Sequence, residues 1–89
     1  MNMTINYKGY DKDFEYRLAE INFDEENKKE SKLAKRLVFF LENVKGYSID
    51  HPVEGYMTCE VENMDEYKEF KKDYKEAKKM ILDCMKYGF

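Results

Sequence analysis

Apolar residues return every three or four positions along two segments of the chain, which is the spacing of an amphipathic helix. In the first segment, between residues 33 and 44, the apolar stripe consists of Leu33, Leu37, Phe40, Leu41 and Val44. In the second, from about residue 63 to residue 87, it consists of Tyr67, Phe70, Tyr74, Ala77, Ile81, Cys84 and Met85. We therefore expect two helices, each with one face buried.

Capping residues predict where these helices begin and end. Asn63 is a suitable N-cap for the second helix, with Glu66 three residues later as in a capping box. Gly46 is a typical C-terminal stop for the first helix. Its start has two candidates, because Asp24 could cap a helix that opens with acidic residues, or Ser31 could cap a later start.

Alternation of apolar and polar residues, which is typical of half-buried strands, appears before and between the helices. The predicted strands span residues 3–7, 14–23, 47–49 and 56–62. The alternation slips at Leu18–Ala19, and a β-bulge would explain the slip. Turn residues favour a turn over residues 8–12 and a loop over residues 50–55, with Pro52 and Gly55 shaping that loop.

These elements predict one α+β domain over residues 1–89, in the order strand, strand, helix, one or two strands, helix. The expected architecture is a small antiparallel sheet of three to four strands with both helices on one face. A domain of this length buries a limited core and is only marginally stable alone, so a homodimer is one way to gain stability.

Composition and charge narrow the function classes. The chain has a net charge of −3 with both signs mixed, which does not favour nucleic acid or membrane as a partner. No positively charged N-terminal region precedes an apolar stretch, and the longest apolar run has five residues, at 37–41. We expect a cytoplasmic protein without a membrane segment, in which Cys59 and Cys84 are free thiols.

The only histidine lies in a segment that could be mistaken for an active site. Ser48, Asp50 and His51 have the chemistry of a catalytic triad, but they lie within four residues, whereas triad members converge from distant positions. Cys59 is expected to face the apolar side of its strand, away from His51. One histidine and two isolated cysteines do not make a zinc site, and the glycines form no phosphate loop. We predict no enzymatic activity, metal or cofactor.

The second helix has an unusual separation of charge. At 100° per residue, its lysines fall between about 20° and 140° from Tyr67, and its acidic residues between about 160° and 260°. The centre of the lysine stripe is formed by Lys68, Lys71, Lys75 and Lys78. Two interpretations stay open. Acidic residues at 24–26, 54, 60 or 62 could lie opposite the stripe, or the stripe could contact an anionic partner such as nucleic acid.

Three aromatic residues are candidates for protein contact. Phe39 lies off the apolar stripe of its helix, and Tyr47 and Tyr56 stand near the starts of predicted strands. We therefore predict a small non-catalytic intracellular protein that binds another protein. Lysine outnumbers arginine fourteen to two, a bias that resembles that of AT-rich genomes. Together with the small size and the lack of catalytic groups, it resembles small phage or mobile-element proteins that inhibit host machinery such as defence systems, which would place the protein in the host cytoplasm. The alternative is a nucleic-acid-associated protein that uses the lysine stripe.

Overall fold

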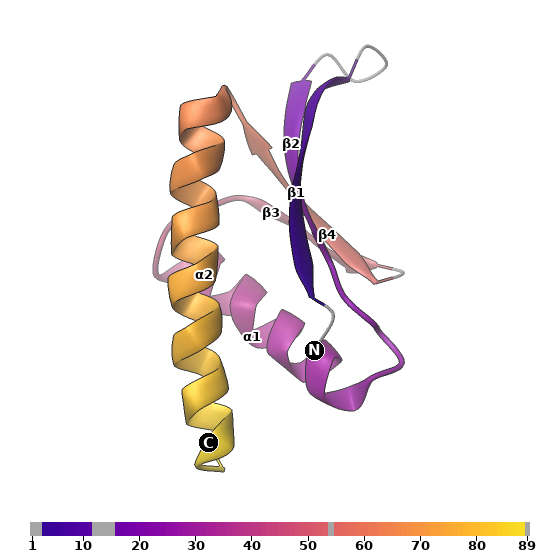
Figure 1. The fold of residues 1–89 in the computed structure, drawn as a ribbon, viewed down its shortest axis with the longest axis vertical. Helices are drawn as coiled ribbons and strands as arrows, with labels where there is room; N and C mark the ends of the chain where they lie inside the picture. Colours follow the sequence, from indigo (N-terminus) through magenta and orange to yellow (C-terminus); the bar gives the residue numbers. More distant parts are fainter. Residues whose placement is uncertain (1–2, 12–15, 54, 89) are drawn as a thin grey trace.

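The computed structural model describes residues 3–11, 16–53 and 55–88. Within these residues, four strands and two helices follow the predicted α+β order (Figure 1). They are β1 (Thr4–Asp11), β2 (Tyr16–Asn22), α1 (Lys28–Asn43), β3 (Ile49–Val53), β4 (Tyr56–Val61) and α2 (Met64–Lys86). The fold class and the antiparallel sheet are thus confirmed, with four strands.

The strands form one antiparallel sheet in the order β1-β2-β4-β3. The last strand in the chain, β4, is inserted between β2 and β3, so that β1 and β3 are the edges. Figure 1 shows both helices on the same side of the sheet, where they cross steeply and contact each other. The other face of the sheet carries no helix in the described part of the chain.

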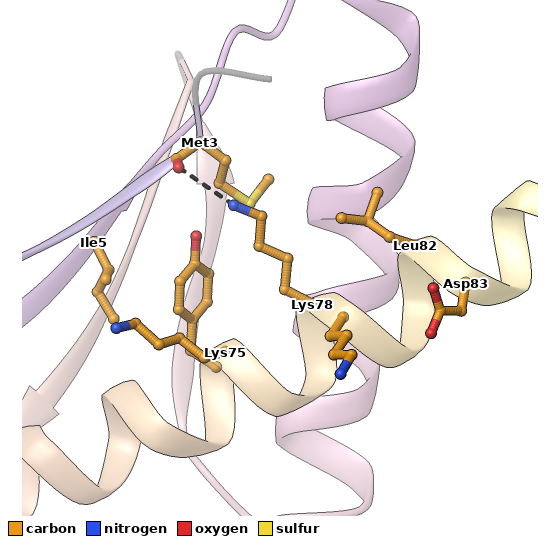
Figure 2. Close-up of a pocket in the computed structure, with 8 residues that line it drawn as sticks. Met3, Ile5, Lys75, Lys78, Leu82 and Asp83 are labelled. Carbon is orange, nitrogen blue, oxygen red and sulfur yellow. Dashed lines mark hydrogen bonds between the residues drawn. The ribbon is translucent and has the colours of Figure 1, made fainter.

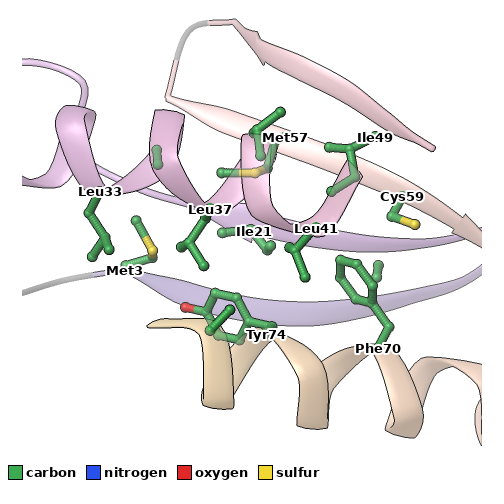
Figure 3. Close-up of a cluster of buried hydrophobic side chains, with 14 of the residues drawn as sticks. Met3, Ile21, Leu33, Leu37, Leu41, Ile49, Met57, Cys59, Phe70 and Tyr74 are labelled. Atoms are coloured by element: carbon green, nitrogen blue, oxygen red, sulfur yellow. The ribbon is translucent and has the colours of Figure 1, made fainter. Parts of the chain in front are cut away.

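The core lies between the helices and one face of the sheet (Figure 3). Alternate residues of β4 point into it, since Met57, Cys59 and Val61 are buried. The predicted stripe of α1 contributes Leu33, Leu37 and Leu41, and α2 contributes Phe70, Tyr74, Ala77 and Ile81. The two helical patterns in the sequence therefore correspond to the two buried helix faces, except that Val44, predicted on the buried stripe, is 63% exposed at the end of α1.

The first hairpin differs from the prediction in where its irregularity lies. β1 continues to Asp11, through the region where a turn was expected from residue 8. Tyr7 pairs with Ala19 and Gly9 pairs with Leu18, so Lys8 is the extra residue. The slip predicted at Leu18–Ala19 is therefore a bulge on the opposite strand. Residues 12–15, where the second predicted strand begins, lie outside the described residues.

The third strand corrects the interpretation of the histidine segment. We predicted a strand at 47–49 and a loop at 50–55, but β3 spans Ile49–Val53 and includes His51 and Pro52. Because β3 is an edge strand, the missing N–H of Pro52 can face solvent without breaking a pair of strands. The pairing with β4 shifts register between Asp50 and Val53. His51 is thus in an edge strand, and the predicted turn position was wrong.

The start of α1 is capped by a residue other than the two predicted candidates, Asp24 and Ser31. Asn27 is the N-cap, and its side-chain Oδ1 accepts hydrogen bonds from the N–H groups of Lys29 (3.0 Å) and Glu30 (3.1 Å). Asp24 instead closes the preceding turn by accepting from the N–H of Glu26 at 3.1 Å. Glu30 is buried and its Oε1 accepts from the N–H of Asp24 at 3.4 Å. Both predicted caps were therefore wrong.

The predicted cap of α2 is confirmed, because Asn63 Oδ1 accepts from the N–H of Glu66 at 2.9 Å. The Glu66 carboxylate accepts in return from the N–H of Glu62 at 3.1 Å, one residue earlier than in an ordinary capping box. At 1.5 Å per residue α2 is about 34 Å long, longer than any strand. Its last turns extend past the core (Figure 1), and Cys84, predicted to be buried, is exposed.

Candidate binding surface

The last helix lies alongside the first strand. The rings of Tyr7 on β1 and Tyr67 at the start of α2 are 5.0 Å apart. At the other end, Lys78 Nζ donates to the carbonyl oxygen of Met3 at 3.5 Å. The start of β1 is therefore next to the C-terminal half of α2, and the two elements run in opposite directions. Within the described residues β1 pairs only with β2, so its outer edge is free.

The four predicted lysines share the flank of α2 that faces this edge. We call Lys68, Lys71, Lys75 and Lys78 the lysine row. Lys68 and Lys75 are exposed, whereas Lys71 and Lys78 are half-buried because they stand closer to the apolar face of the helix. Lys75 and Lys78 line a groove together with Ile5 of β1 and Met3 just before that strand. The structure therefore brings the predicted lysines together and adds a neighbour, β1, that the helical pattern alone could not identify.

Charge compensation of the lysine row can be tested from the ion pairs. The structure contains a pair between Lys8 and Glu20 at 3.5 Å and a pair between Lys45 and Asp73 at 3.7 Å. In the described ranges, no carboxylate lies within 4 Å of an amine of the lysine row. This includes the carboxylates at 24–26, 60 and 62 that were considered as partners; residue 54 lies outside the described part.

The groove between β1 and α2 has a volume of about 440 Å³. Its apolar walls are formed by Met3, Ile5 and Leu82, and Lys75, Lys78 and Lys79 line it as well. In Figure 2, Lys75 extends toward Ile5 and Lys78 toward Met3. Positive charge and apolar surface thus meet in one depression beside the free edge of the sheet.

Tyr74, on α2, also lines this groove. Its side chain is buried, and its hydroxyl has no hydrogen-bond partner among the described residues. Figure 3 shows this hydroxyl directed toward Met3. Burial raises the pKa of the Tyr74 hydroxyl to about 12, so at neutral pH it is an unused hydrogen-bond donor.

The opposite flank of α2 is acidic. A second groove there, of about 690 Å³, is lined by Lys45, Gly46, Tyr47, Asp65, Glu66, Glu69 and Asp73. The Tyr47 hydroxyl donates to Asp73 at 2.6 Å, and the ring packs edge-on against Phe70 with 4.8 Å between centroids. Burial, followed by the bond to Asp73, strongly raises the pKa of Tyr47. Tyr47, predicted to contact a partner, is therefore half-buried and held against α2.

The other two predicted contact residues lie on different sides of the molecule. Phe39 is 68% exposed, on the side of α1 away from the core. Tyr56 is 43% exposed and pairs with Asn22 on the face of the sheet that the helices leave open. The three predicted aromatic residues thus do not form one surface, and their contact with a protein stays a prediction.

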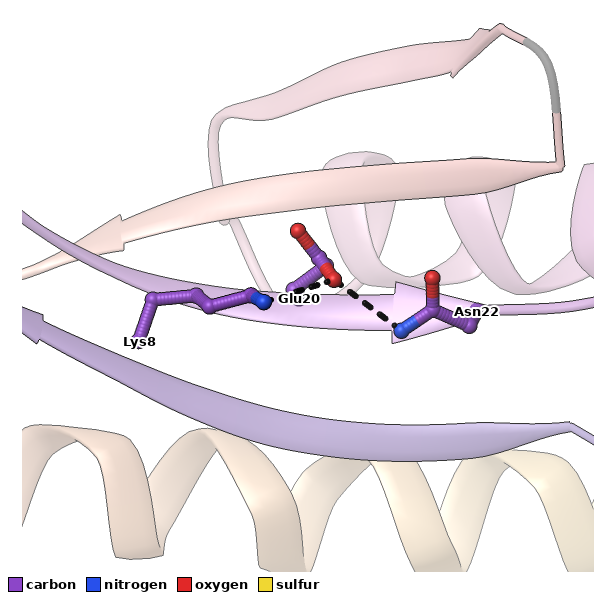
Figure 4. Close-up of polar contacts among 3 residues, drawn as sticks. All are labelled: Lys8, Glu20 and Asn22. Carbon is purple, nitrogen blue, oxygen red and sulfur yellow. Dashed lines mark hydrogen bonds and ion pairs between the residues drawn. The ribbon is translucent and has the colours of Figure 1, made fainter.

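The open face of the sheet was not singled out from the sequence. Its centre is Glu20, whose Oε1 accepts from Asn22 Nδ2 at 3.1 Å and pairs with Lys8 at 3.5 Å (Figure 4). On the neighbouring strands, Thr58 Oγ1 donates to Asp50 at 3.2 Å. The alternation of apolar and polar residues could have identified this face. Its polar side chains bond to one another.

The thiol of Cys59, one of the candidate catalytic groups, lies in the core of the protein. Cys59 is buried, and burial, with the nearby carboxylates of Glu66, Asp50 and Glu60, raises the pKa of its thiol to about 11. The protonated thiol is a poor nucleophile at neutral pH. Among the described residues, no group of three or more histidine, cysteine or acidic side chains could hold a metal ion. Nor does either helix there have the length and apolarity needed to cross a membrane.

The lysine row, the groove and the edge of β1 thus lie next to one another and form one candidate surface. Comparison with other proteins adds no further assignment: no protein family, curated protein or solved structure matches the chain.

Proposed function

We propose that this protein is a non-catalytic binding protein that contacts an acidic segment of another protein. The observation that carries the proposal is the lysine row, which has no ion pair in the described part of the chain and lies beside the free edge of β1. Four neighbouring ammonium groups without carboxylate partners favour an anionic partner.

The edge of β1 favours a polypeptide as that partner. An extended segment can add to a free strand edge through backbone hydrogen bonds, as in β-augmentation. Side chains of an added strand alternate between the two faces of the sheet, so every second one would face α2. Acidic residues at those positions would pair with the lysine row, which gives the partner a simple pattern of alternating acidic residues.

Nucleic acid is the alternative, and it is less well supported. No arginine stands in α2, although arginine is the residue that most often reads base edges and grips phosphate with two bonds. A phosphate backbone would use the lysine row alone and would gain nothing from a free strand edge or an apolar groove. Its signature would be a steep loss of affinity with salt.

The proposal is compatible with an inhibitor in a host cytoplasm, which the composition suggested. A small protein that covers an acidic segment of a larger one prevents other proteins from using that segment. The support for such a role is the size and composition of the chain, together with the absence of a metal-holding group of side chains among the described residues. The blocked protein is to be identified by experiment.

The test is a titration of the isotope-labelled protein with a synthetic peptide of alternating valine and glutamate, followed by NMR. A peptide of alternating valine and glutamine, and mixed-sequence DNA and RNA, are titrated in parallel at about 50 to 200 mM salt. We expect the glutamate peptide to shift the amide signals of β1 and α2. The double substitution Lys68→Gln and Lys71→Gln should weaken binding of the glutamate peptide about two- to thirty-fold, since each exposed ion pair contributes roughly 0.2–1 kcal/mol.

The matched control is Lys32→Gln with Lys35→Gln, which removes two exposed charges at the same spacing from α1. Glutamate-peptide binding that is equally weak in both double variants would contradict the proposal. Binding of DNA or RNA that falls steeply with salt and is lost only in the α2 variant would replace it with the nucleic-acid alternative.

A further inference from the structure

The groove beside β1 has the size and walls of a small-ligand site. Its volume of about 440 Å³ lies within the range of roughly 300–1,000 Å³ that is common for such sites. Met3, Ile5 and Leu82 give it apolar walls, and Ile5 and Leu82 are only partly buried. An apolar body placed there would remove this surface from water, which is favourable.

The charges around the groove favour a negatively charged ligand. Lys75, Lys78 and Lys79 line it, against one carboxylate, Asp83, which stands next to Leu82 on α2 (Figure 2). None of these four side chains forms an ion pair with a described residue. The bond from Lys78 to the Met3 carbonyl is 3.5 Å long, at the weak end of hydrogen bonding, so Lys78 can exchange it for a stronger acceptor.

The buried hydroxyl of Tyr74 supplies the second polar group. A buried donor without a partner is costly, and a ligand oxygen that accepts from it would remove that cost. Lys78 lies over the Tyr74 ring, with its Nζ 5.7 Å from the ring centroid. A small displacement of the Lys78 side chain would let one carboxylate accept from both residues. Bonds of this kind to an ionised acceptor are among the strong ones.

We infer that the groove binds a carboxylate attached to an apolar body, with the carboxylate held by Lys78 and Tyr74 and the body covering Ile5 and Leu82. The ligand could be a free amphiphile, such as a medium-chain fatty acid, or the C-terminal residue of a peptide that ends in an apolar side chain. The inference goes beyond the proposed function, because it depends on Tyr74 and Leu82 and not on the free edge of β1.

The experiment follows the methyl signals of Met3, Ile5 and Leu82 by NMR while three probes are added to the protein. The probes are decanoate below its micelle concentration, decanol as its uncharged counterpart, and an acetylated tetrapeptide that ends in leucine with a free carboxylate. We expect saturable shifts of these methyl signals with decanoate or with the peptide, and binding of decanol that is at least about ten-fold weaker than that of decanoate.

Two substitutions test the polar contacts. Lys78→Met should weaken the charged ligand at least about ten-fold, whereas Lys72→Met, which removes an exposed charge from the same helix outside the groove, should leave its affinity nearly unchanged. Tyr74→Phe keeps the ring and removes the hydroxyl. It should weaken binding while leaving the stability of the free protein equal or higher, which a merely structural hydroxyl would not do.

The probes also separate the two sources of the ligand. Shifts with decanoate alone support a free amphiphile, and shifts with the peptide alone support a chain terminus. Absence of saturable shifts with both probes overturns the inference, and so does an equal effect of Lys78→Met and Lys72→Met. Failure of the proposed function would appear separately, in the glutamate-peptide titrations of the unmodified protein and of the Lys68→Gln, Lys71→Gln double variant.

Discussion

At the scale of single residues, Gly55 combines an unusual backbone angle with a close contact. Its φ is +84°, in the left-handed region that residues with a side chain rarely adopt. A Cβ at this position would stand 2.8 Å from the carbonyl oxygen of Phe23, and the N–H of Phe23 donates to the Gly55 carbonyl at 2.8 Å. The β3–β4 hairpin is thereby tied to the end of β2, and any side chain at Gly55 pushes this contact apart.

Gly55→Ala should lower the free energy of unfolding by about 2–3 kcal/mol, because it adds a steric clash to the cost of a positive φ. Gly46→Ala is the matched control, since Gly46 has a similar φ of +79° but nothing within 4 Å of the added carbon. It should cost only about 1 kcal/mol. Urea denaturation measures both values. Equal costs would show that the contact with Phe23 contributes nothing.

Cys59 links a buried thiol to stability at alkaline pH. Its pKa rises from an ordinary value of 9.0 to about 11 in the folded protein, mainly through burial. Above pH 9 the unfolded chain therefore loses this proton while the folded protein keeps it. Because the unfolded state then binds fewer protons, stability falls as pH rises between about 9 and 11. The raised pKa of Tyr74, about 12, extends the loss to higher pH.

We predict that the free energy of unfolding falls by about 1–2 kcal/mol between pH 9 and 11, and that Cys59→Ala flattens this part of the profile. Cys84→Ala removes an exposed thiol and should leave the slope as it is. Denaturant unfolding at several pH values gives the profiles. A slope that is the same in the Cys59→Ala and Cys84→Ala proteins would mean that the buried thiol does not carry the effect.

At the scale of elements, α2 illustrates what a helical pattern can and cannot establish. Its cap at Asn63, its buried face and its lysine row follow from local spacing, and each can be located without tertiary information. The neighbour of the lysine row cannot be located in this way, because it is distant in the chain: Lys78 and Met3, which are hydrogen-bonded, are 75 positions apart. The exposure of Cys84 also depends on where the sheet ends, which the periodicity of the helix does not contain.

The errors elsewhere have related physical causes. Three residues near the start of α1, Asp24, Asn27 and Ser31, can all cap a helix, and the choice is made by the buried Glu30, whose carboxylate holds the turn before Asn27. In β3, Pro52 suggests a loop on local grounds. Its place in a strand is acceptable only because β3 is an edge, and the order of strands is a property of the whole sheet.

The charge pattern of α2 gives a prediction about helix stability. All four residues three or four positions from Lys75 are lysines, namely Lys71, Lys72, Lys78 and Lys79. Like charges at this spacing destabilise a helix by a few tenths of a kcal/mol each. Lys75→Gln should therefore raise the free energy of unfolding by about 0.5 kcal/mol at low salt, and less at high salt, because glutamine has a similar helix propensity.

Lys72→Gln is the control for this prediction, because Lys72 has two lysines and two glutamates, Glu69 and Glu76, at the same spacings. Its substitution should change stability little. Urea denaturation at two salt concentrations provides the comparison. A loss of stability in the Lys75→Gln protein would show that acidic groups compensate the lysine row within the fold, and would weaken the case for an anionic partner.

At the scale of the whole molecule, the chain order and the spatial order of the strands differ. β4 follows β3 but lies between β2 and β3, so the sheet is complete only when α1 has crossed it and β4 has paired on both sides. The candidate surface is built in the same way, from the first strand and the last helix. Local sequence could identify its lysines, but the surface exists only in the complete fold.

The two helices and the sheet contribute to one hydrophobic core, so we expect the protein to unfold cooperatively. Substitutions at two phenylalanines, one buried and one exposed, test this expectation. Phe70 is 0% exposed, so Phe70→Ala should lower the free energy of unfolding by about 3–5 kcal/mol, a large part of the total for a small domain. Phe39 is 68% exposed, and Phe39→Ala should change stability by at most about 0.5 kcal/mol.

Helix content and tyrosine fluorescence should decline together as urea is added, in the unmodified protein and in both variants. Separate transitions would mean that the helices and the sheet unfold as independent units. A loss of partner binding in Phe39→Ala at unchanged stability would place Phe39 in a contact surface.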